Sequence, residues 1–533
     1  MKIAIEGCCH SQLETIYRTL EHIQQVEKIK IDLLLICGDV QTVRNWADLD
    51  SVAVPIKHRY LGTFYKYYSG ECKAPIPTLV IGGNHEASNY LWELYHGGWV
   101  CENIYFLGYA GVVNFGGLRI GGISGIYKMK HYDLGHFETL PYSDSSLRSI
   151  YHIRNYEVTK LEQLRKQLDI FMSHEWPRGI ERYGDTRRLI ANKPFFQGEA
   201  TNNLGNPACE QLLYKLKPRY WFAAHLHVKF SAVLNHDSPR IPITSKTSTT
   251  SPTSISTTVA TSNITKTTEV TREQVVPVVS VVDPDEIQIN MTDSEDNDNE
   301  MDNNEDDGKP TSTAIATAES STAAIEDNNN PEVNTEEDVI SLSTTPTHFD
   351  DAVMLTAEDD DDEVMIGSST MDASTPPVDF SISSPSSSAD RITRFLALDK
   401  CMPFRDFLQI LDFPEANGPL EFTYDEEWLA ITKAMHPYLS IAQHQTKIPS
   451  DTELQRQIEV QKTWVRENVT SRVNGLTIPH NFKHTSPPIV EDDNNLKWNS
   501  LDPRQPFLNP QTVTFNELLG IENKINPKGQ IIK

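Results

Sequence analysis

Three features are scarce or missing in this sequence, and each excludes a class of protein. No run of about 18 or more apolar residues occurs, so we expect no membrane-spanning helix. The start MKIAIEGCCH lacks the charged stretch and apolar core of a secretory signal. Seven cysteines occur without the spacing of a zinc ribbon or a small disulfide framework. We therefore expect an intracellular protein in a reducing compartment.

Residues 241–390 lack almost everything that builds a core. They contain no Trp or Tyr, two Phe and two Gly, and they carry 32 acidic but four basic residues. Such a composition buries too little apolar surface to offset chain entropy, so we expect a disordered acidic insertion. Its apolar run 275–282, followed by Asp283, resembles a SUMO-interaction motif that would recruit a protein partner. A chance cluster in a linker is the alternative.

The acidity of the whole chain is concentrated in this insertion. The formal net charge is −27, of which residues 241–390 contribute −28 and all other residues together +1. A body that is neutral on balance can still carry a local basic groove. The overall charge therefore does not exclude a nucleic-acid partner.

The first 240 residues alternate short apolar strands with helical stretches, which is typical of an α/β domain. The predicted strands are KIAIEG, LLLICGDV, TLVIGGNHE, IYFLG, LRIGGISG, DIFMSHE and YWFAAHLHV. Residues 11–28 show helical spacing of the apolar side chains Leu13, Ile16, Tyr17, Leu20, Ile23 and Val26. We expect residues 391–413 to complete this domain with two strands around a Cys-Met-Pro turn, because a long insertion costs little loop-closure entropy.

The C-terminal part, residues 414–533, is expected to be a mostly helical domain. One predicted helix contains Glu427, Trp428, Leu429 and Ile431. A second begins with a capping box formed by Ser450 and Glu453. Its apolar face comprises Leu454, Ile458 and Val465.

Five polar motifs each follow a predicted strand and carry the candidate chemistry. They are Cys8-Cys9-His10, Gly38-Asp39, Gly83-Asn84-His85-Glu86, Ser173-His174-Glu175 and Ala224-His225-Leu226-His227. A lone Gly-Asp after a strand is usually only a turn. Five such motifs in one order supply a thiol, several imidazoles, a carboxylate and an amide. That is a ligand mixture for a pair of first-row transition ions.

The order of these motifs resembles the pattern D-x-H, G-D, G-N-H-E, H and G-H-x-H of the calcineurin-like metallophosphoesterase superfamily. Within it, GCCH with Cys8 in place of the first Asp, SHEWP and AHLHVKF look like the RNA lariat debranching enzyme family. The similarity extends to residues 146–158 and 395–411 and to EWLAITKA. Ala224 in place of Gly, and Ser11 after His10, depart from the pattern.

This resemblance implies a fold, an activity and a set of ligands. The fold would be a metallophosphoesterase β-sandwich flanked by helices. The activity would be metal-dependent hydrolysis of the 2′–5′ phosphodiester bond at the branch point of intron lariat RNA. Two adjacent positions would hold Fe(II), Zn(II) or Mn(II), with Asp39 as the bridge. The first would be completed by Cys8, His10 and His227, and the second by Asn84, His174 and His225. His85 would stay off the metals and face the phosphate and the leaving oxygen.

Three side chains near these ligands leave alternatives open. The thiolate of Cys8 favours Fe(II) or Zn(II), or it stays off the metal and leaves the first position weak. Cys9 should point to the opposite face of the strand and pack in the core. Glu86 and Glu175 would orient His ligands, or they are simply exposed.

Bases and aromatics interleave between residues 127 and 156. The candidate RNA contacts there are Lys128, Lys130, Arg148, Tyr151, Arg154 and Tyr156. Such a surface can stack splayed bases and pair with phosphates, with an ordinary exposed loop and helix as the alternative. A lariat substrate would imply a nuclear protein, with the cytoplasm as a second location.

Two other functions stay open at this point. A protein phosphatase or a DNA-repair nuclease can use the same scaffold, but these usually keep Asp where Cys8 stands. A non-catalytic scaffold would have lost metal ligands, and here the other six ligand positions and His85 are all present.

Overall fold

A computed structural model describes residues 1–197, 204–240, 391–489, 502 and 504–531. The described residues belong to one compact unit. The disorder expected for residues 241–390, and the candidate partner motif at 275–282, lie outside the described residues.

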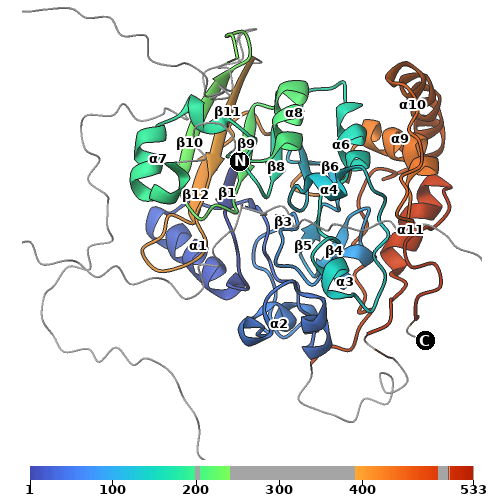
Figure 1. The fold of residues 1–533 in the computed structure, drawn as a ribbon, viewed down its shortest axis with the longest axis horizontal. Helices are drawn as coiled ribbons and strands as arrows, with labels where there is room; N and C mark the ends of the chain where they lie inside the picture. The colour runs from blue at the N-terminus through green and yellow to red at the C-terminus, as the bar shows by residue number, and fades with distance from the viewer. Residues whose placement is uncertain (198–203, 241–390, 490–501, 503, 532–533) are drawn as a thin grey trace, which may run out of the picture. The chain divides into compact units, whose positions relative to one another are not determined.

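Two β-sheets form the centre of this unit (Figure 1). The first has six strands in the order β12-β1-β2-β3-β5-β4. They are β1 (Lys2–Glu6), β2 (Leu33–Ile36), β3 (Thr78–Val80), β4 (Gly98–Cys101), β5 (Ile104–Phe106) and β12 (Leu408–Asp412). The second has seven strands in the order β10-β11-β9-β8-β7-β6-β13. They are β6 (Ala110–Phe115), β7 (Leu118–Ile123), β8 (Ile170–Ser173), β9 (Tyr220–Ala223), β10 (Phe230–Asn235), β11 (Ile392–Ala397) and β13 (Thr423–Tyr424).

The two sheets pack face to face. Alternate residues of each strand point to opposite sides of the sheet, so one set faces the other sheet and the next set faces the helices. Ile3 and Ile5 of β1 share a buried cluster with Met172 of β8 and Phe222 of β9. Ala4 belongs instead to a larger cluster that includes side chains of the covering helices. This arrangement is a β-sandwich flanked by helices, and it confirms the predicted fold class.

The chain beyond residue 390 returns to both sheets. β11 runs parallel to β9 and antiparallel to β10, with Ala397 opposite Phe230. β12 runs antiparallel to β1, with Asp412 opposite Lys2. The predicted strands do not include β4, β6, β10 or β13. Glycines at 98 and 111 weaken the apolar pattern of β4 and β6.

Eight helices accompany the strands in the described residues before 241. They are α1 (Leu13–Glu27), α2 (Phe64–Ser69), α3 (Ser88–Glu93), α4 (Met129–Tyr132), α5 (Asp144–Leu147), α6 (Asn155–Glu162), α7 (Thr186–Asn192) and α8 (Pro207–Leu216). Short 3₁₀ helices occur at Trp46–Ser51, Ile56–His58, Ile180–Tyr183 and Pro194–Gln197. α1 buries Leu13, Ile16, Tyr17 and Leu20 as predicted. Val26, in the last turn of the helix, is instead 54% exposed.

The described C-terminal part is helical only in part. It contains α9 (Glu426–Met435), α10 (Asp451–Val465) and α11 (Pro510–Leu519), a 3₁₀ helix (His436–Tyr438) and one π-helical turn (Arg466–Thr470). α10 buries Leu454, Ile458 and Val465 as predicted. The predicted capping box is wrong, because the Ser450 side chain makes no cap hydrogen bond and Glu453 pairs with Arg456 at 2.7 Å.

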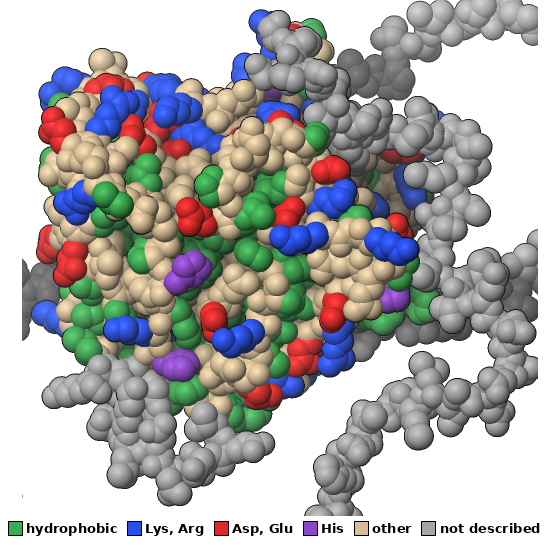
Figure 2. Space-filling model, turned by 180° about the vertical axis from the view of Figure 1, so that it is seen from behind, with side chains coloured by type: hydrophobic (Ala, Val, Ile, Leu, Met, Phe, Trp, Pro, Cys, Tyr) green, Lys and Arg blue, Asp and Glu red, His purple; other side chains and the backbone are tan. Residues whose placement is uncertain are grey.

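The surface mixes charges of both signs. On the face drawn in Figure 2, Lys and Arg side chains are interspersed with Asp and Glu. Within the described ranges, no helix combines the length and apolar character needed to cross a membrane.

Candidate metal centre

The seven predicted metal ligands converge where parallel strands of the two sheets end. β1, β2 and β3 are parallel neighbours, as are β8 and β9. The carboxyl ends of parallel strands meet at one edge, where polar side chains can approach one another. The turns after these strands carry the motifs that contain Cys8, Asp39, Asn84, His174 and His225.

The ligands predicted for the first position form one compact cluster. Donor atoms of Cys8, His10, Asp39 and His227 all lie within 4.8 Å of one another. The Nε2 atoms of His10 and His227 are 3.1 Å apart, and His10 Nε2 is 3.8 Å from Asp39 Oδ2. A thiol, two imidazoles and a carboxylate therefore point at one place.

The ligands predicted for the second position meet around His174. Its Nε2 atom lies 3.2 Å from Asn84 Oδ1, 3.2 Å from His225 Nδ1 and 3.4 Å from Asp39 Oδ2. Its Nδ1 atom lies 2.8 Å from the carbonyl oxygen of Cys37. Donation to that carbonyl places the Nδ1 proton, so Nε2 is the nitrogen that could bind a metal. Asp39 reaches both groups of ligands, which is the geometry expected of a bridge.

His85 lies beside both positions without joining either cluster. Its backbone N–H donates to Asp39 Oδ1 at 2.9 Å, and its ring centre lies 5.6 Å from that of His10. The buried Nδ1 atom of His85 has no hydrogen-bond partner in the protein. The ring is therefore close to the metal centre and still has a nitrogen to offer to a substrate.

The backbone of this site adopts conformations that ordinary residues rarely take. Twelve described residues other than glycine have positive φ, and six of them lie in the motif turns: His10, Ser11, Asp39, Gln41, His225 and His227. Left-handed backbone at non-glycine residues costs on the order of 1 kcal/mol or more each, and such strain clusters at functional sites. Ser11, which departs from the family pattern, has a φ of 63° where glycine would be relaxed.

Two glycines let the motif turns approach one another. A Cβ atom on Gly83 would lie 2.1 Å from Asp39 Oδ1, and one on Gly38 would lie 2.4 Å from His174 Nδ1. No side chain fits at either position without moving a ligand. The glycines of the Gly-Asp and Gly-Asn-His-Glu motifs are therefore needed by the ligands themselves.

Glu86 holds the turn that presents Asp39. The carboxylate is buried and accepts the backbone N–H groups of Val40 and Gln41 at 2.9 Å each and of Gly83 at 3.1 Å. The expectation that Glu86 orients a His ligand is wrong, because its partners are backbone groups of two ligand turns. The alternative of simple exposure is also wrong.

Glu175 plays a comparable part on the other side of the site. It accepts the backbone N–H of Tyr127 at 2.6 Å and the side-chain amide of Asn206 at 2.9 Å. Its bonds thus connect the Ser173-His174-Glu175 motif to the start of the segment predicted to contact RNA. Cys9 is fully buried in the core that contains the helices, as predicted.

Most of the imidazoles are held neutral by burial. Burial lowers the pKa of His10 to about 4, of His225 to about 3 and of His227 to about 2. Burial also opposes charge on His174, but the carboxylate of Asp39 outweighs it and raises the pKa of that ring. Neutral imidazole is the form that binds metal.

The donor set fits a pair of first-row transition ions. The imidazole nitrogens of His10 and His227, and those of His174 and His225, lie about 3 Å apart. Each pair can hold only one proton between its two nitrogens, because burial disfavours a second. Thiol, imidazole, carboxylate and amide donors together suit Fe(II), Zn(II) or Mn(II) better than Mg(II). The Sγ atom of Cys8 is within reach of the first position and also accepts the backbone N–H of His225 at 3.1 Å.

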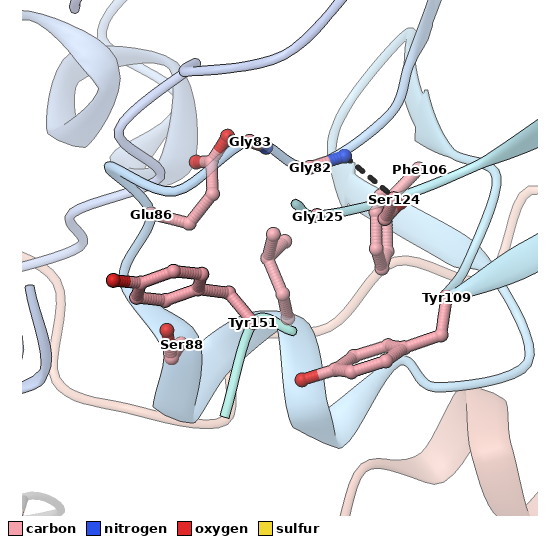
Figure 3. A pocket seen from close by; sticks show the side chains of 10 residues that line it. Gly82, Gly83, Glu86, Ser88, Phe106, Tyr109, Ser124, Gly125 and Tyr151 are labelled. Atoms are coloured by element: carbon pink, nitrogen blue, oxygen red, sulfur yellow. Dashed lines mark hydrogen bonds between the residues drawn. The ribbon is translucent and has the colours of Figure 1, made fainter. Parts of the chain in front are cut away.

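Four of the six predicted RNA contacts lie at the surface. Lys130 and Arg148 are exposed, and Lys128 and Tyr151 are partly buried. Tyr151 lines a crevice of about 270 Å³, its open mouth included, next to Gly83 and Glu86 (Figure 3). Contact between RNA and these four side chains remains a prediction.

The other two predicted contacts are wrong. Arg154 is fully buried, pairs with Glu138 at 2.5 Å and donates to the carbonyl of His131 at 3.0 Å. Tyr156 is 2% exposed and donates to the carbonyl of Met435 at 2.9 Å. Both side chains support the surface segment from beneath, because the interior offers the charge partner and the acceptors that they need.

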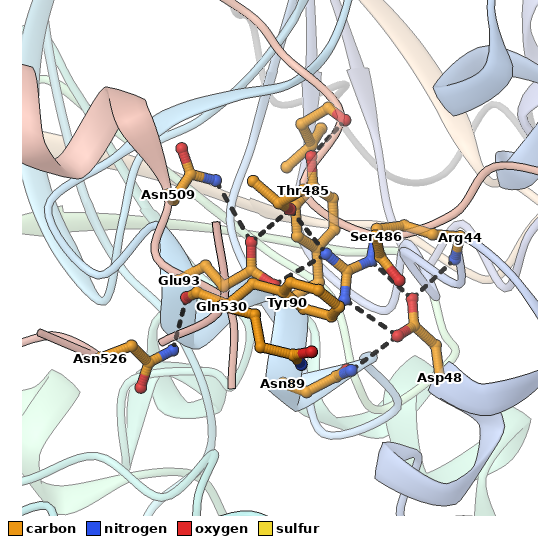
Figure 4. A network of polar contacts seen from close by, with 12 residues as sticks. Arg44, Asp48, Asn89, Tyr90, Glu93, Thr485, Ser486, Asn509, Asn526 and Gln530 are labelled. Atoms are coloured by element: carbon orange, nitrogen blue, oxygen red, sulfur yellow. Dashed lines mark hydrogen bonds and ion pairs between the residues drawn. The ribbon is translucent and has the colours of Figure 1, made fainter. Parts of the chain in front are cut away.

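A buried ionic network next to the site had no signal in the sequence. Arg44, five residues after Asp39, donates to Asp48 at 2.8 Å, to Glu93 at 2.8 Å and to Thr485 at 2.9 Å (Figure 4). Its guanidinium carbon lies 4.1 Å from the ring centre of Tyr90. Since Arg44 and Thr485 are 441 residues apart, only the folded structure reveals the contact.

The sandwich and its two-position site are those of a metal-dependent phosphoesterase, and comparisons with known proteins agree. Residues 1–229 match the family model of the calcineurin-like phosphoesterases. Residues 390–524 match that of the lariat debranching enzyme C-terminal domain.

Individual relatives extend this match over nearly the whole chain. The lariat debranching enzyme of Arabidopsis thaliana is 36% identical over 98% of this chain and 86% of its own length. That of Schizosaccharomyces pombe is 36% identical over 98% of this chain and 96% of its own. The Homo sapiens enzyme is 58% identical over 239 residues, 45% of this chain and 44% of its own. The chain belongs to the lariat debranching enzyme family.

Proposed function

We propose that this chain hydrolyses the 2′–5′ phosphodiester bond at the branch point of lariat RNA and so converts lariats to linear RNA. The observation that carries this proposal is the complete ligand set, with His85 beside it, in a member of the lariat debranching enzyme family. A scaffold that had lost catalysis would not retain seven convergent ligands. We expect branched RNA as the partner.

Seven of the site residues would hold the metals, and His85 would act on the substrate. When two ions are bound, they polarise the phosphate and lower the pKa of water toward neutrality. Asp39 would be the ligand shared by the two positions. Cys8, His10 and His227 would complete one position. Asn84, His174 and His225 would complete the other. We propose Fe(II), Zn(II) or Mn(II) as the metals.

His85 supplies the proton chemistry. Its backbone is anchored to Asp39, so the ring keeps a fixed place beside the metal centre. Burial lowers the pKa of the His85 ring, and an anionic phosphate bound beside it would favour the imidazolium form. That form would stabilise charge that develops on the phosphate and protonate the departing 2′-oxygen of the branch nucleotide. A 2′-alkoxide is a poor leaving group, so the proton must arrive as the bond breaks.

Two further parts of the proposal follow from the substrate and the sequence. Excised lariats are produced where introns are removed, so we propose that the protein acts in the nucleus. The acidic insertion is a candidate site for a protein partner.

A cleavage assay tests the proposal. A synthetic branched RNA with one 2′–5′ linkage is incubated with Fe(II), Zn(II) or Mn(II), beside linear 3′–5′ RNA, a DNA end and a phosphopeptide. We expect cleavage of the 2′–5′ bond alone, lost in His85→Ala and retained in His22→Ala, an exposed histidine on α1. Cleavage of the DNA or phosphopeptide instead would move the function to a nuclease or phosphatase.

A further inference from the structure

The strongly exposed aromatic side chains of the described residues lie in two connections of the fold. Only three aromatic residues in the described ranges are exposed by half or more: Trp46 (66%), Tyr60 (50%) and Phe404 (108%). Trp46 and Tyr60 lie in the connection between β2 and α2, which begins with Asp39. Phe404 lies in the connection between β11 and β12. Both connections leave strand ends that carry or adjoin predicted metal ligands, since Asp39 begins the first and Lys400 of the second pairs with Cys8.

Tyr60 is fastened directly to the first metal position. Its hydroxyl donates to the carbonyl of His10 at 3.2 Å, and Thr63 donates to the carbonyl of Ser11. A Cβ atom on Gly62 would lie 2.0 Å from Ser11 Oγ, so the loop is in contact with the His10 turn. The exposed ring of Tyr60 is therefore next to a predicted ligand and is held there.

The loop of Phe404 is fastened to the end of the strand that carries Cys8. The backbone N–H of Cys401 donates to the carbonyl of Cys8 at 3.2 Å, and that of Gly7 donates to the carbonyl of Phe407 at 3.1 Å. Phe404 projects into solvent from the middle of this loop with a φ of 61°. A left-handed backbone and a fully exposed phenyl ring give no gain in stability to the free protein.

Basic side chains lie next to Tyr60 and Phe404 in the sequence. Lys57 is exposed three residues before Tyr60, and Arg59 is next to it. Arg405 follows Phe404 and is 37% exposed, at 3.4 Å from Asp399. Single exposed apolar residues are ordinary on protein surfaces. The rings of Tyr60 and Phe404, fastened beside the first metal position and accompanied by bases, instead match the way unpaired nucleotides are bound, by stacking of bases and pairing of phosphates. Trp46 adds a third exposed ring in the connection that begins with Asp39.

We propose that Trp46, Tyr60 and Phe404 are stacking platforms for the single-stranded RNA that flanks the branch point. This inference rests on the proposed function and deepens it, because it assigns a second RNA-binding surface besides the segment from Lys128 to Tyr151. The surface binds by stacking, so it tolerates different base sequences. It acts on the arms of the branched RNA and leaves the reacting phosphate to the metals and His85.

The test compares two triple variants with matched exposure. In the first, Trp46→Ala, Tyr60→Ala and Phe404→Ala remove the rings, and its metal content is measured beside that of the wild type because the hydrogen bond from Tyr60 to His10 is lost. In the control, Ile441→Ala, Val460→Ala and Val473→Ala remove exposed apolar side chains of the C-terminal part, which are 48%, 54% and 93% exposed. KM and kcat are measured on a branched RNA with arms of several nucleotides and on a minimal branched trinucleotide. Fluorescence anisotropy follows binding of a labelled linear single-stranded RNA.

The ring variant should raise KM for the long-armed RNA by roughly tenfold or more and weaken linear RNA binding by a similar factor, with kcat unchanged. Cleavage of the minimal substrate, and both activities of the control variant, should match the wild type. Equal KM and equal RNA binding in the ring variant and the wild type would overturn the proposal. A different outcome separates the two proposals. If the wild type cleaves neither branched RNA but binds linear RNA more tightly than the ring variant does, the stacking surface is supported and debranching is rejected.

Discussion

Two buried polar regions lie close together in this protein, and their hydrogen bonding differs. At the metal centre, imidazoles, a thiol and a carboxylate point at one another, and the His85 Nδ1 atom has no partner. In the network of Arg44, Asp48, Glu93 and Thr485, each charged group is met by an opposite charge or a hydroxyl. The first arrangement needs an external group to be complete, whereas the second is complete in itself. One is built for binding and the other for holding the fold.

The largest effect should come from removing the charge that both metal positions share. Asp39→Asn keeps an acceptor for the His85 N–H but removes the bridging carboxylate. We expect loss of both metals and a fall in activity of at least about a thousandfold. Metal content per chain, measured by mass spectrometry after dialysis, checks this. A variant that still bound two ions would show that Asp39 is not the bridge.

Removing His85 should separate chemistry from metal binding. His85→Ala should lower kcat by about 10²–10⁴-fold, the usual contribution of a positioned general acid, while the metal content stays that of the wild type. Single-turnover cleavage of branched RNA gives the rate. Full activity in this variant would assign the proton to another group.

A smaller loss is expected when the support of the Asp39 turn is weakened. Glu86→Gln keeps the shape of the side chain but can no longer accept N–H groups with two carboxylate oxygens. We expect metal affinity to fall by roughly 10–100-fold, as for other residues that orient ligands. Glu21→Gln, on the exposed face of α1, is the control. Unchanged affinity would mean that the turn holds its shape unaided.

In the network of Arg44, Asp48, Glu93 and Thr485, a substitution should lower stability and leave metal binding unchanged. Thr485→Val removes the hydroxyl that bonds to Arg44 at 2.9 Å and to Glu93 at 2.6 Å. The free energy of unfolding should fall by about 1–3 kcal/mol, because charged groups lose a partner in the interior, while metal content stays constant. Thr514→Val, on the exposed side of α11, serves as control. Metal loss at unchanged stability would contradict the division between the two regions.

A comparable effect on stability concerns a buried cation, Lys160, which has no carboxylate at ion-pair distance among the residues that the structure describes. Burial lowers the pKa of Lys160 to about 8 from 10.5, and its ammonium lies 4.5 Å from the ring centre of Trp428. Between those pH values the unfolded chain keeps the proton that the folded chain has released, so stability from this group rises with pH. Lys160→Met should be more stable than the wild type by about 1–3 kcal/mol at pH 7, and the difference should shrink by pH 10. Denaturant unfolding at both pH values measures it, and a constant difference would contradict the assignment.

The convergence of the predicted ligands could be foreseen from the sequence, and the side chains that support them could not. The order of five polar motifs, each after an apolar strand, indicates which side chains meet, because parallel strands end at one edge. The hydrogen bonds from backbone N–H groups to Glu86, and the contact between Arg44 and Thr485, depend on how loops fold onto one another. No local sequence pattern predicts such contacts. The interleaved bases and aromatics at residues 148–156 were ambiguous for the same reason. Arg148 is exposed, whereas Arg154 and Tyr156 find buried partners.

Debranching by this protein depends most directly on the link between bound metal and cleavage of the branch. The decisive measurement follows the rate of 2′–5′ cleavage and the number of bound ions in the same samples as metal-free protein is titrated with Fe(II), Zn(II) or Mn(II). We predict that cleavage appears as two ions bind per chain, that linear RNA stays intact, and that Asp39→Asn shows neither binding nor cleavage. Cleavage without bound metal, or two bound ions without any cleavage of branched RNA, would contradict the account.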